Sequence, residues 1–457
     1  MTSILISGMG IVSALGNNVE ENLRSLQSKK SGIAPLRYLR TSHTEFPVGE
    51  VKMTDEEMMS LLNIPENKPT TRTSLMGMLA VREALQNAGI LNPSKGKDCF
   101  PSLDGMRVAF ISGTTVGGMD KSERFYLDFF DSDTKNAYIS THDCGSCTEM
   151  IADYFGIFSQ VDTISTACSS AANAIILGAE LLKSGRADIV VAGGSECLTK
   201  FHLNGFNSLM ILDREPCRPF DATRAGINLG EGAAYLVIES APQAPFGSRT
   251  GGKATKDGKC SAIFTKGNKK PLCRLSGYAN TCDAYHQTAS SPDGEGAYLA
   301  MKKALEMAEL TPDQIDYINA HGTGTDNNDL SEGTAIVRLF GEKIPPVSST
   351  KSFTGHTTSA AGSVESVIPI LALQHNFIPV NLNFSEKMPE LPFIPYIDVG
   401  FSEMRYETLD MRCEKKDYLK SHNPKSHNPI SHIQIRNVLC NSFGFGGNDS
   451  SLIFSMI

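Results

Sequence analysis

The sequence lacks two features that would each assign it to a broad class of proteins. No apolar run approaches the ~20 residues of a membrane-spanning helix. Positive charge is not in excess, because 42 Lys and Arg residues stand against 50 Asp and Glu, a formal net charge of −8. No global basic field therefore favours nucleic acid or an anionic membrane as a partner. Tryptophan is also absent, and its absence excludes nothing.

The eleven cysteines lack the regular spacing of a disulfide framework. Their odd number and scattered positions indicate reduced thiols, and we expect a cytoplasmic protein. Cys144 and Cys147 form a CxxC pair without a second one, so we predict no metal or redox role there. The first 16 residues are apolar but have no basic region and are broken by glycines. They predict a strand and a turn instead of a signal peptide.

The length of 457 residues allows two core-sized units, because single cores stop growing at roughly 250–300 residues. We predict an N-terminal half over 1–242 and a C-terminal half over 272–457, joined by a Gly- and Lys-rich linker or exposed excursion at 243–271. Both halves alternate strand and helix patterns, which predicts an α/β fold. A duplication of one α/β unit is plausible, although no sequence repeat demonstrates it.

Hydrophobic periodicity predicts the individual elements. Strands are expected at 3–8, 107–114, 161–166, 187–196, 235–238, 315–322 and 345–350. Helices are expected at 19–32, 73–89, 121–130, 171–182, 294–310, 331–340 and 360–376. The stretch 435–457 predicts two strands across a glycine hairpin.

One segment breaks this alternation. A low-complexity insertion at about 413–432 contains the tandem repeat KSHNPKSHNP and three histidines, His422, His427 and His432. A His-rich tract can bind metal. We favour a polar, turn-forming insertion and predict no metal site.

Cys168 lies where the backbone period changes. The residues before it are β-branched and predict the end of a buried strand, whereas those after it recur at helical spacing with many small side chains. At a helix N-terminus, unpaired amides and the helix dipole favour a thiolate, so we expect a lowered pKa for this thiol. The alternative, a buried small hydrophobic residue, stays open from this stretch alone.

Two histidines and a lysine supply the partners that a cysteine nucleophile needs. His321 falls at the carboxyl end of a predicted strand, where α/β proteins place their sites. His356 falls between a predicted strand and a helix of small residues, and Lys351 precedes it by five positions. Neither histidine lies on an amphipathic helix face, so we predict that both face a cleft.

The glycine hairpin near residue 445 carries two aromatic side chains, Phe443 and Phe445. Glycines let backbone amides approach a ligand closely, and a large ring at a turn tip indicates a role beyond the turn. We predict that this loop supplies an oxyanion donor and a hydrophobic gate.

These motifs together resemble the β-ketoacyl-acyl-carrier-protein synthases, the elongating condensing enzymes of fatty-acid and polyketide synthesis. The matching stretches are TACSS around Cys168, NAHGTGT around His321, SSTKSFTGH around Lys351 and His356, and NSFGFGG around Phe443 and Phe445. SGMGIVSALG, RPFDATRAG, LGEGAAYLVIE and DAYHQT also match. The resemblance extends over residues 4–454 in the order of the family.

The resemblance implies a fold and a reaction. The fold is α/β and thiolase-like, with two similar βαβ-type halves whose mixed sheets stack between helix layers, usually in a homodimer. Cys168 would take an acyl group from acyl-carrier protein as a thioester, with the backbone amides of Cys168 and Phe445 holding the oxyanion. His321 and His356, as neutral donors, would bind the malonyl thioester. Loss of CO2 would then leave an enolate that attacks the acyl thioester and extends the chain by two carbons.

Further roles are implied by the same resemblance. Lys351 would orient and polarise the site, with Asp329 and Glu332 as its acidic surroundings, and Phe445 would act as a gate. No cofactor would be bound, because the phosphopantetheine arm of acyl-carrier protein brings the substrates. That acidic partner requires a basic patch at the mouth of the site. The candidates for this patch are Arg72, Arg124 and Arg214.

Departures from the family pattern leave alternatives. The SS after the nucleophile, the missing proline after NAHGTGT, the basic excursion and the KSHNP repeat leave room for a specialised ketosynthase acting on polyketide or aryl-polyene chains. A non-catalytic chain-length partner, acting in a heterodimer, would lack the nucleophile. A thiolase using coenzyme A would need a second site cysteine, for which Cys440 is the candidate. Cys168 and the two histidines favour the condensing enzyme.

Overall fold

The computed structural model describes residues 3–92, 103, 105–128, 137–241, 270–397 and 434–457. The predicted linker at 243–271 lies outside these ranges except for its last two residues, and the insertion at about 413–432 lies wholly outside them. Both predicted halves are represented, the first by described residues up to 241 and the second by described residues from 270 onward.

Within these ranges, ten strands form one mixed sheet in the order β3-β2-β4-β5-β1-β6-β10-β9-β7-β8. The strands of the N-terminal half are β1 (Ile4–Ser13), β2 (Val108–Gly113), β3 (Gln160–Ile164), β4 (Ile189–Glu196) and β5 (Gly232–Ser240). Those of the C-terminal half are β6 (Cys273–Cys282), β7 (Tyr317–Asn319), β8 (Val347–Ser348), β9 (Asn437–Gly444) and β10 (Asn448–Ser455).

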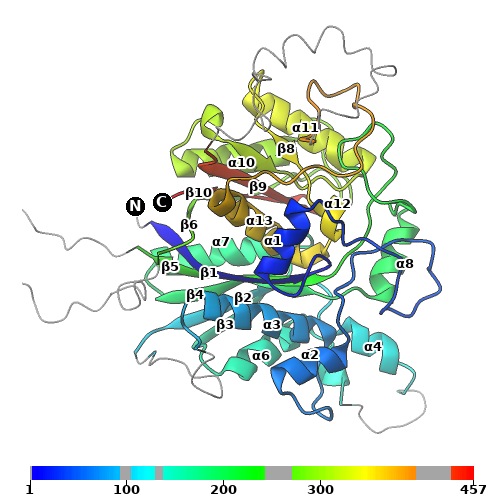
Figure 1. Ribbon diagram of the computed structural model, residues 1–457, viewed down its shortest axis with the longest axis vertical. Helices are drawn as coiled ribbons and strands as arrows, with labels where there is room; N and C mark the ends of the chain where they lie inside the picture. The colour runs from blue at the N-terminus through cyan, green and yellow to red at the C-terminus, as the bar shows by residue number, and fades with distance from the viewer. Residues whose placement is uncertain (1–2, 93–102, 104, 129–136, 242–269, 398–433) are drawn as a thin grey trace, which may run out of the picture.

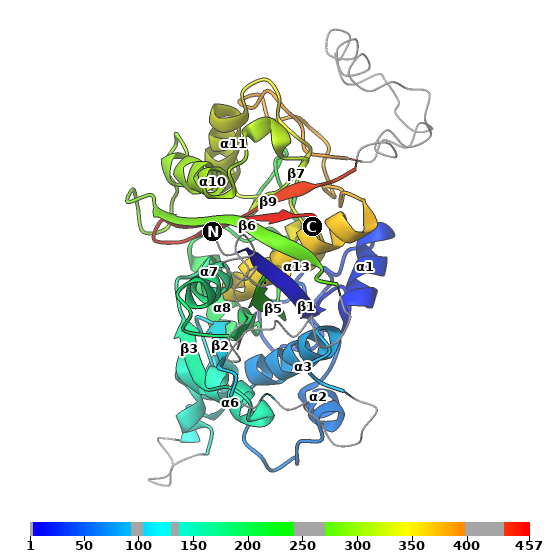
Figure 2. The same ribbon diagram turned by 90° about the vertical axis from the view of Figure 1, so that its left-hand side faces the viewer.

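The strand order demonstrates the duplication that the sequence only suggested. The first half is ordered β3-β2-β4-β5-β1, and the second half, β8-β7-β9-β10-β6, repeats this order strand for strand. Corresponding pairs also agree in direction: β2 is parallel to β3 and β4, as β7 is to β8 and β9, while the remaining pairs are antiparallel. The halves meet where β1 runs antiparallel to β6, with Ile4–Ile6 paired to Cys273–Leu275 (Figure 2).

Helices cover both faces of each set of strands (Figure 1). Between the two sets lie α7 (Ser170–Lys183) and α13 (Ala361–His375). The outer face of the first set carries α3 (Arg72–Asn87) and α6 (Cys144–Phe155), and that of the second carries α10 (Glu295–Ala308) and α11 (Asp326–Phe340). The remaining described helices are α1 (Val19–Gln27), α2 (Asp55–Leu62), α4 (Met119–Phe125), α8 (Lys200–Ser208) and α12 (Lys351–Thr354), with 3-10 turns at Ile139–Thr141, Pro312–Gln314 and Thr358–Ala360.

Burial on both faces explains why the inner strands are apolar throughout. Along β4, Val190 and Ala192 face the central helices, whereas Ile189 and Val191 face α3. The alternation of side chains thus fills two hydrophobic layers from one strand. The fold therefore confirms the predicted layers: the two sets of strands, which are joined through β1 and β6, stack between layers of helices.

Some elements differ from their predictions. The first helix ends at Gln27, before a left-handed Lys29, and not at Gly32. Helices α2, α6 and α8 were not predicted, and the CxxC pair lies on α6, where the buried Cys147 contacts the hydroxyl of Thr71 at 3.2 Å. The hairpin β9–β10 and the helix containing Pro369 are confirmed.

Candidate active site

The turn between β3 and α7 positions Cys168, as the change of period predicted. Ala167 adopts a left-handed conformation with φ of +52°. The Ser170 hydroxyl stabilises this turn, since it donates to the Ala167 carbonyl at 2.6 Å and accepts from the Thr166 amide at 2.8 Å. The Ser169 hydroxyl also lies 2.8 Å from the Thr166 carbonyl oxygen, so both serines of TACSS hold the tight turn that presents the thiol to the second half.

Both predicted histidines lie next to this thiol. His356 Nε2 is 2.9 Å from Cys168 Sγ. The rings of His321 and His356 are 5.3 Å apart and nearly perpendicular, at 84°. Residues almost 190 positions apart in the chain thus form one cluster.

Lys351 lies buried directly behind His321. Its ammonium group is 3.1 Å from His321 Nδ1, donates to the His321 carbonyl at 2.6 Å and forms an ion pair with Glu365. An ammonium has only donors, so Nδ1 of His321 must accept, and its hydrogen lies on Nε2. The lysine therefore fixes the tautomer that leaves Nε2 as a donor.

Glu365 is the residue that sequence reasoning missed. It lies on α13 within an apolar stretch, VESVIPILAL, and is 2% exposed. Burial raises its pKa to about 7, and Lys351 opposes that rise. A lone carboxylate at a buried position was the available signal, because such a charge requires a partner.

The expected acidic surroundings of Lys351 were assigned wrongly. Glu332 instead accepts hydrogen bonds from the amides of His321 and Gly322 at 2.9 and 2.8 Å. Asp329 accepts from the Phe220 amide at 2.7 Å and from the Gly324 amide at 3.1 Å. Both carboxylates hold the backbone of the loop that carries His321, and neither pairs with Lys351.

The protonation states follow from burial. Burial raises the pKa of Cys168 to about 11, although Lys351 and the backbone amides of Phe445 and Cys168 lower it. The prediction that the helix terminus lowers the pKa of Cys168 is therefore wrong, because desolvation raises this pKa by more. Burial, followed by the charge of Lys351, holds the pKa of His321 and of His356 well below the ordinary value. Both imidazoles are neutral.

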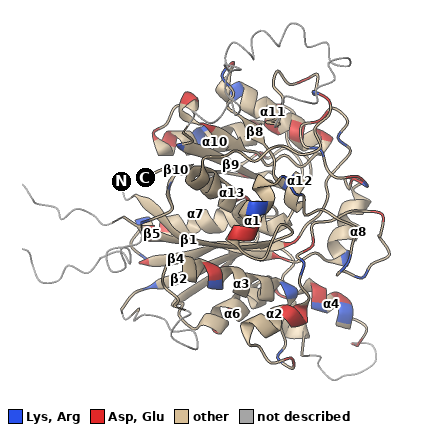
Figure 3. Ribbon diagram, viewed as in Figure 1, with Lys and Arg blue, Asp and Glu red and all other residues tan. Residues whose placement is uncertain are grey.

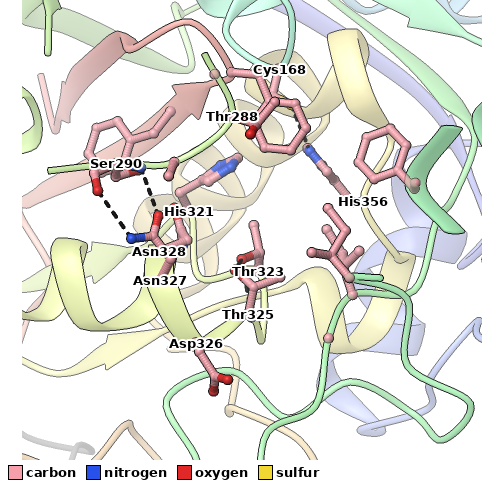
Figure 4. A pocket seen from close by; sticks show the side chains of 18 of the residues that line it. Cys168, Thr288, Ser290, His321, Thr323, Thr325, Asp326, Asn327, Asn328 and His356 are labelled. Carbon is pink, nitrogen blue, oxygen red and sulfur yellow. Dashed lines mark hydrogen bonds between the residues drawn. The ribbon is translucent and has the colours of Figure 1, made fainter. Parts of the chain in front are cut away.

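A cavity of about 240 Å³ opens onto this cluster (Figure 4). Cys168, His321 and His356 lie at its base, and its lining includes Phe443 and Phe445. Phe445 is 36% exposed and stacks on Phe206 of α8, with ring centroids 5.8 Å apart. Phe443 is buried, 5.9 Å from the His321 ring. Cys440 does not line the cavity, because its side chain is buried against Asn319 and the Glu365 carbonyl.

The three arginines proposed for docking differ in availability. Arg72 forms ion pairs with Glu231 and Asp55 at 2.7 and 3.0 Å and is only 11% exposed, so its assignment to a surface patch is wrong. Arg124 and Arg214 are exposed. Arg124 lies over the Phe125 ring at 5.2 Å on α4, a helix that carries charges of both signs (Figure 3).

Two features are absent from the part of the chain that the structure describes. No three His, Cys, Asp or Glu side chains are grouped so as to hold a metal ion within these ranges. No described helix is long and apolar enough to cross a membrane. The histidines of the KSHNP repeat lie outside the described residues.

The duplicated fold, with a cysteine from the first half facing two histidines from the second, defines a thiolase-like condensing enzyme. The model of the beta-ketoacyl synthase N-terminal domain matches residues 1–244, and that of the C-terminal domain matches residues 272–385. The chain belongs to the β-ketoacyl synthase family.

Individual relatives agree with this assignment. The 3-oxoacyl-[acyl-carrier-protein] synthase 2 of Coxiella burnetii is 29% identical over 99% of this chain and 98% of its own length. A ketosynthase from Xenorhabdus doucetiae, solved in complex with its chain length factor, is 27% identical with a TM-score of 0.74, covering 100% of this chain and 98% of that one. The fold alone is also shared with the ishigamide ketosynthase/chain length factor, which has a TM-score of 0.79 at 24% identity and is covered over 99% of its length by 100% of this chain.

Proposed function

We propose that this protein catalyses the decarboxylative condensation of malonyl-acyl-carrier protein with an acyl group held as a thioester on Cys168, extending fatty-acyl chains by two carbons. The observation that carries this proposal is the cluster of one cysteine and two neutral histidines at the base of one cavity. The family and its 3-oxoacyl synthase relative support condensation as the reaction.

Acyl transfer is the first stage. A thiol whose pKa is raised to about 11 needs a proton acceptor near neutral pH. His356 Nε2, 2.9 Å from Sγ, takes this proton as sulfur attacks the acyl thioester of the carrier protein. The amides of Cys168 and Phe445 hold the oxyanion. The intermediate then expels the carrier thiolate, which takes the proton from His356, so the charges balance.

Condensation is the second stage. The Nε2–H of His321, set by Lys351, donates to the carbonyl of the malonyl thioester, and neutral His356 donates beside it once its single proton has moved from Nδ1 to Nε2. The C–C bond to the carboxylate breaks, CO2 leaves, and the electron pair forms an enolate. This enolate attacks the acyl carbonyl on Cys168 and the C–S bond breaks. The released thiolate takes up one proton from solvent, which balances the charge of the carboxylate lost as CO2. Phe445, at the mouth and stacked on Phe206, is placed to gate acyl entry.

Substrates reach this site on the phosphopantetheine arm of acyl-carrier protein, and the chain itself needs no bound cofactor. Among the candidate residues for that docking, Arg124 and Arg214 remain, since both are exposed. We further propose a homodimer. Strand β3 is a sheet edge whose Val161 is 38% exposed, and an unpaired edge is a site where a second strand can add.

The alternatives have less support. A non-catalytic chain-length partner would lack the nucleophile, whereas here Cys168 lies in contact with His356. A thiolase needs a second cysteine in the cavity, and Cys440 does not line it. A specialised ketosynthase for polyketide or aryl-polyene chains remains the second candidate, acting as a homodimer or paired with a homologous subunit. It is favoured by the similarity to the Xenorhabdus ketosynthase that was solved with a chain length factor.

The test measures two products from malonyl- and acyl-carrier proteins: released CO2 and the elongated acyl-carrier protein, by mass spectrometry. The wild type is expected to form both. Cys168→Ala should fold normally but lose condensation by roughly 10³-fold or more, since it removes the nucleophile. Cys282→Ala, at an exposed cysteine, is the matched control and should be unaffected.

Elongation by Cys168→Ala, or no CO2 from the wild type with any acyl donor, contradicts the proposal. A panel of acyl donors separates the fatty-acyl from the polyketide assignment.

A further inference from the structure

A pair of carboxylic acids lies beneath the loop that carries Phe445. Asp449 is the second residue of β10 and is 5% exposed. Asp283 directly follows β6, which runs antiparallel to β10 with Asp449 paired to Thr281. Because alternate residues of a strand share a face, Asp283 and Asp449 are diagonal neighbours on one face of this ladder.

Both side chains converge on Gly296 at the start of α10. The Gly296 amide donates to Asp283 Oδ1 at 3.4 Å, and the Ser291 amide donates to Asp283 Oδ2 at 2.6 Å. A Cβ on Gly296 would collide with Asp449 Oδ2 and lie 2.8 Å from Asp283 Cβ. Only glycine therefore leaves room there for the two carboxyl groups.

The pair joins two walls of the cavity mouth. The turn at 444–447 forms one wall, and the segment 283–291 forms another through Thr288 and Ser290. Two backbone hydrogen bonds of 2.8 Å link these walls, from Asp283 to the Gly447 carbonyl and from Gly446 to the Gln287 carbonyl. A change in the separation of the two carboxyl groups would thus shift the turn that carries Phe445 relative to the segment 283–291.

The opposite face of β10 is attached to the nucleophile turn. Asn448, which precedes Asp449, accepts hydrogen bonds from the Ser169 hydroxyl and the Asn173 amide at 2.7 and 2.8 Å. Neighbouring residues of a strand point to opposite faces. The start of β10 is therefore fixed toward Cys168 on one side and depends on the carboxyl pair on the other.

Among the described residues, no compensating positive charge acts on the Asp449 carboxyl group. The charges that act on Asp449 are those of Asp283, on the segment after β6, and Glu332, on α11, and both are negative. Within the same ranges, no group donates a hydrogen bond to the Asp449 carboxyl group. Burial and these two charges raise the pKa of Asp449 to about 7. A protonated acid can donate to a neighbouring carboxylate, whereas two ionised groups repel each other.

We propose that Asp449 is a positioning residue that carries a proton, donates it in a hydrogen bond to Asp283 and so holds the turn at 444–447 against the segment 283–291. As a role in catalysis this rests on the proposed function, because it acts through the Phe445 amide and ring. The hydrogen bond itself is independent of the reaction. Loss of the proton loosens the mouth of the cavity.

The sign of the pH dependence follows from the raised pKa. The closed form binds the proton more tightly than an opened form in which Asp449 has an ordinary pKa. Opening should therefore become easier by up to tenfold per pH unit between about pH 4 and 7, and level off above about 7.

Hydrogen exchange of the Gly446 and Gly447 amides from pH 5 to 8, corrected for intrinsic rates, tests the hydrogen bond without any substrate. Wild-type protection should fall up to pH 7 and then level off. Asp449→Asn, which cannot ionise, should show no such fall. Asp283→Asn removes the neighbouring charge, so amide protection in this variant should fall by less and should stop falling at a lower pH. Asp293→Asn, at an exposed carboxylate nearby, should behave as the wild type.

The proposed hydrogen bond is overturned if amide protection in the wild type does not change with pH, or if protection in Asp449→Asn falls as it does in the wild type. Condensation rates over the same pH range test the positioning role. The ratio of the wild-type rate to that of Asp449→Asn should fall as Asp449 ionises. A constant ratio overturns the positioning role even if hydrogen exchange behaves as expected. Absence of condensation by the wild type at every pH would instead contradict the proposed function and would leave the exchange test of the hydrogen bond unaffected.

Discussion

At the scale of single residues, Lys351 and Glu365 form a buried pair with two separable consequences. Replacing Lys351 with Met leaves Glu365 buried without its partner and frees His321 Nδ1. We expect a loss of about 3–5 kcal/mol in the free energy of unfolding, because an uncompensated buried charge remains. We also expect CO2 release to fall by roughly 10²-fold as the His321 tautomer is no longer set.

A double variant separates these effects. Lys351→Met combined with Glu365→Gln removes both charges and should recover most of the lost stability, as measured by urea unfolding, but not the CO2 release. Recovery of CO2 release would show that the pair serves folding alone and would contradict a role for Lys351 in setting the His321 tautomer.

The residues of the site were predictable to different degrees. Cys168, His321 and His356 could be found because each falls at the end of a predicted strand or beside one, where an α/β fold gathers side chains at one edge. Glu365 stands out as a lone carboxylate in an apolar stretch, but its pairing with Lys351, fourteen positions away, could not be predicted because the pairing depends on how the chain packs. The pKa of Cys168 could not be predicted either, because its direction depends on burial, which is a property of the packed fold.

At the scale of elements, the close approach of α7 and α13 behind the nucleophile requires glycine. A Cβ on Gly362 would lie 2.6 Å from the Ala172 amide nitrogen. Gly362→Ala should therefore destabilise the protein by about 1–3 kcal/mol, because neither helix can move within the central core. Gly205 on α8 is the matched control, since a Cβ there meets nothing within 4 Å. Gly205→Ala should be stabilising by about 0.5–1 kcal/mol. Equal effects in urea unfolding would contradict this account of Gly362.

Two of the helices that sequence reasoning missed, α6 and α8, share a cause. Helices α6 and α8 contain Cys, Gly, Asn and aromatic residues with weak helix propensity. They form because tertiary packing supplies what propensity does not: Ile151 and Phe155 of α6 are buried against the first set of strands, and Leu203 of α8 is fully buried. Strands such as β4 were predictable because burial on both faces leaves an uninterrupted apolar run.

At the scale of the whole molecule, the two halves share one core. The central hydrophobic cluster contains Val190 and Leu236 from the first set of strands and Val438 and Phe454 from the second, packed on α7 and α13. Sequence alone suggested two units, since it shows where strands lie but not which layers they share. The repeated strand order is a property of pairing, which periodicity does not record.

A shared core predicts one cooperative unfolding transition for the described fold. Neither half can bury α7 or α13 alone, so separating the halves exposes the largest hydrophobic layer among the described residues. We expect hydrogen exchange measured in β4 and in β9 to give the same urea midpoint, with circular dichroism coincident with both. Val364→Ala on α13 should lower both midpoints equally, because its side chain belongs to the common layer. A lower midpoint in one half, in the wild type or in this variant, would show that the duplicated units remain independent domains.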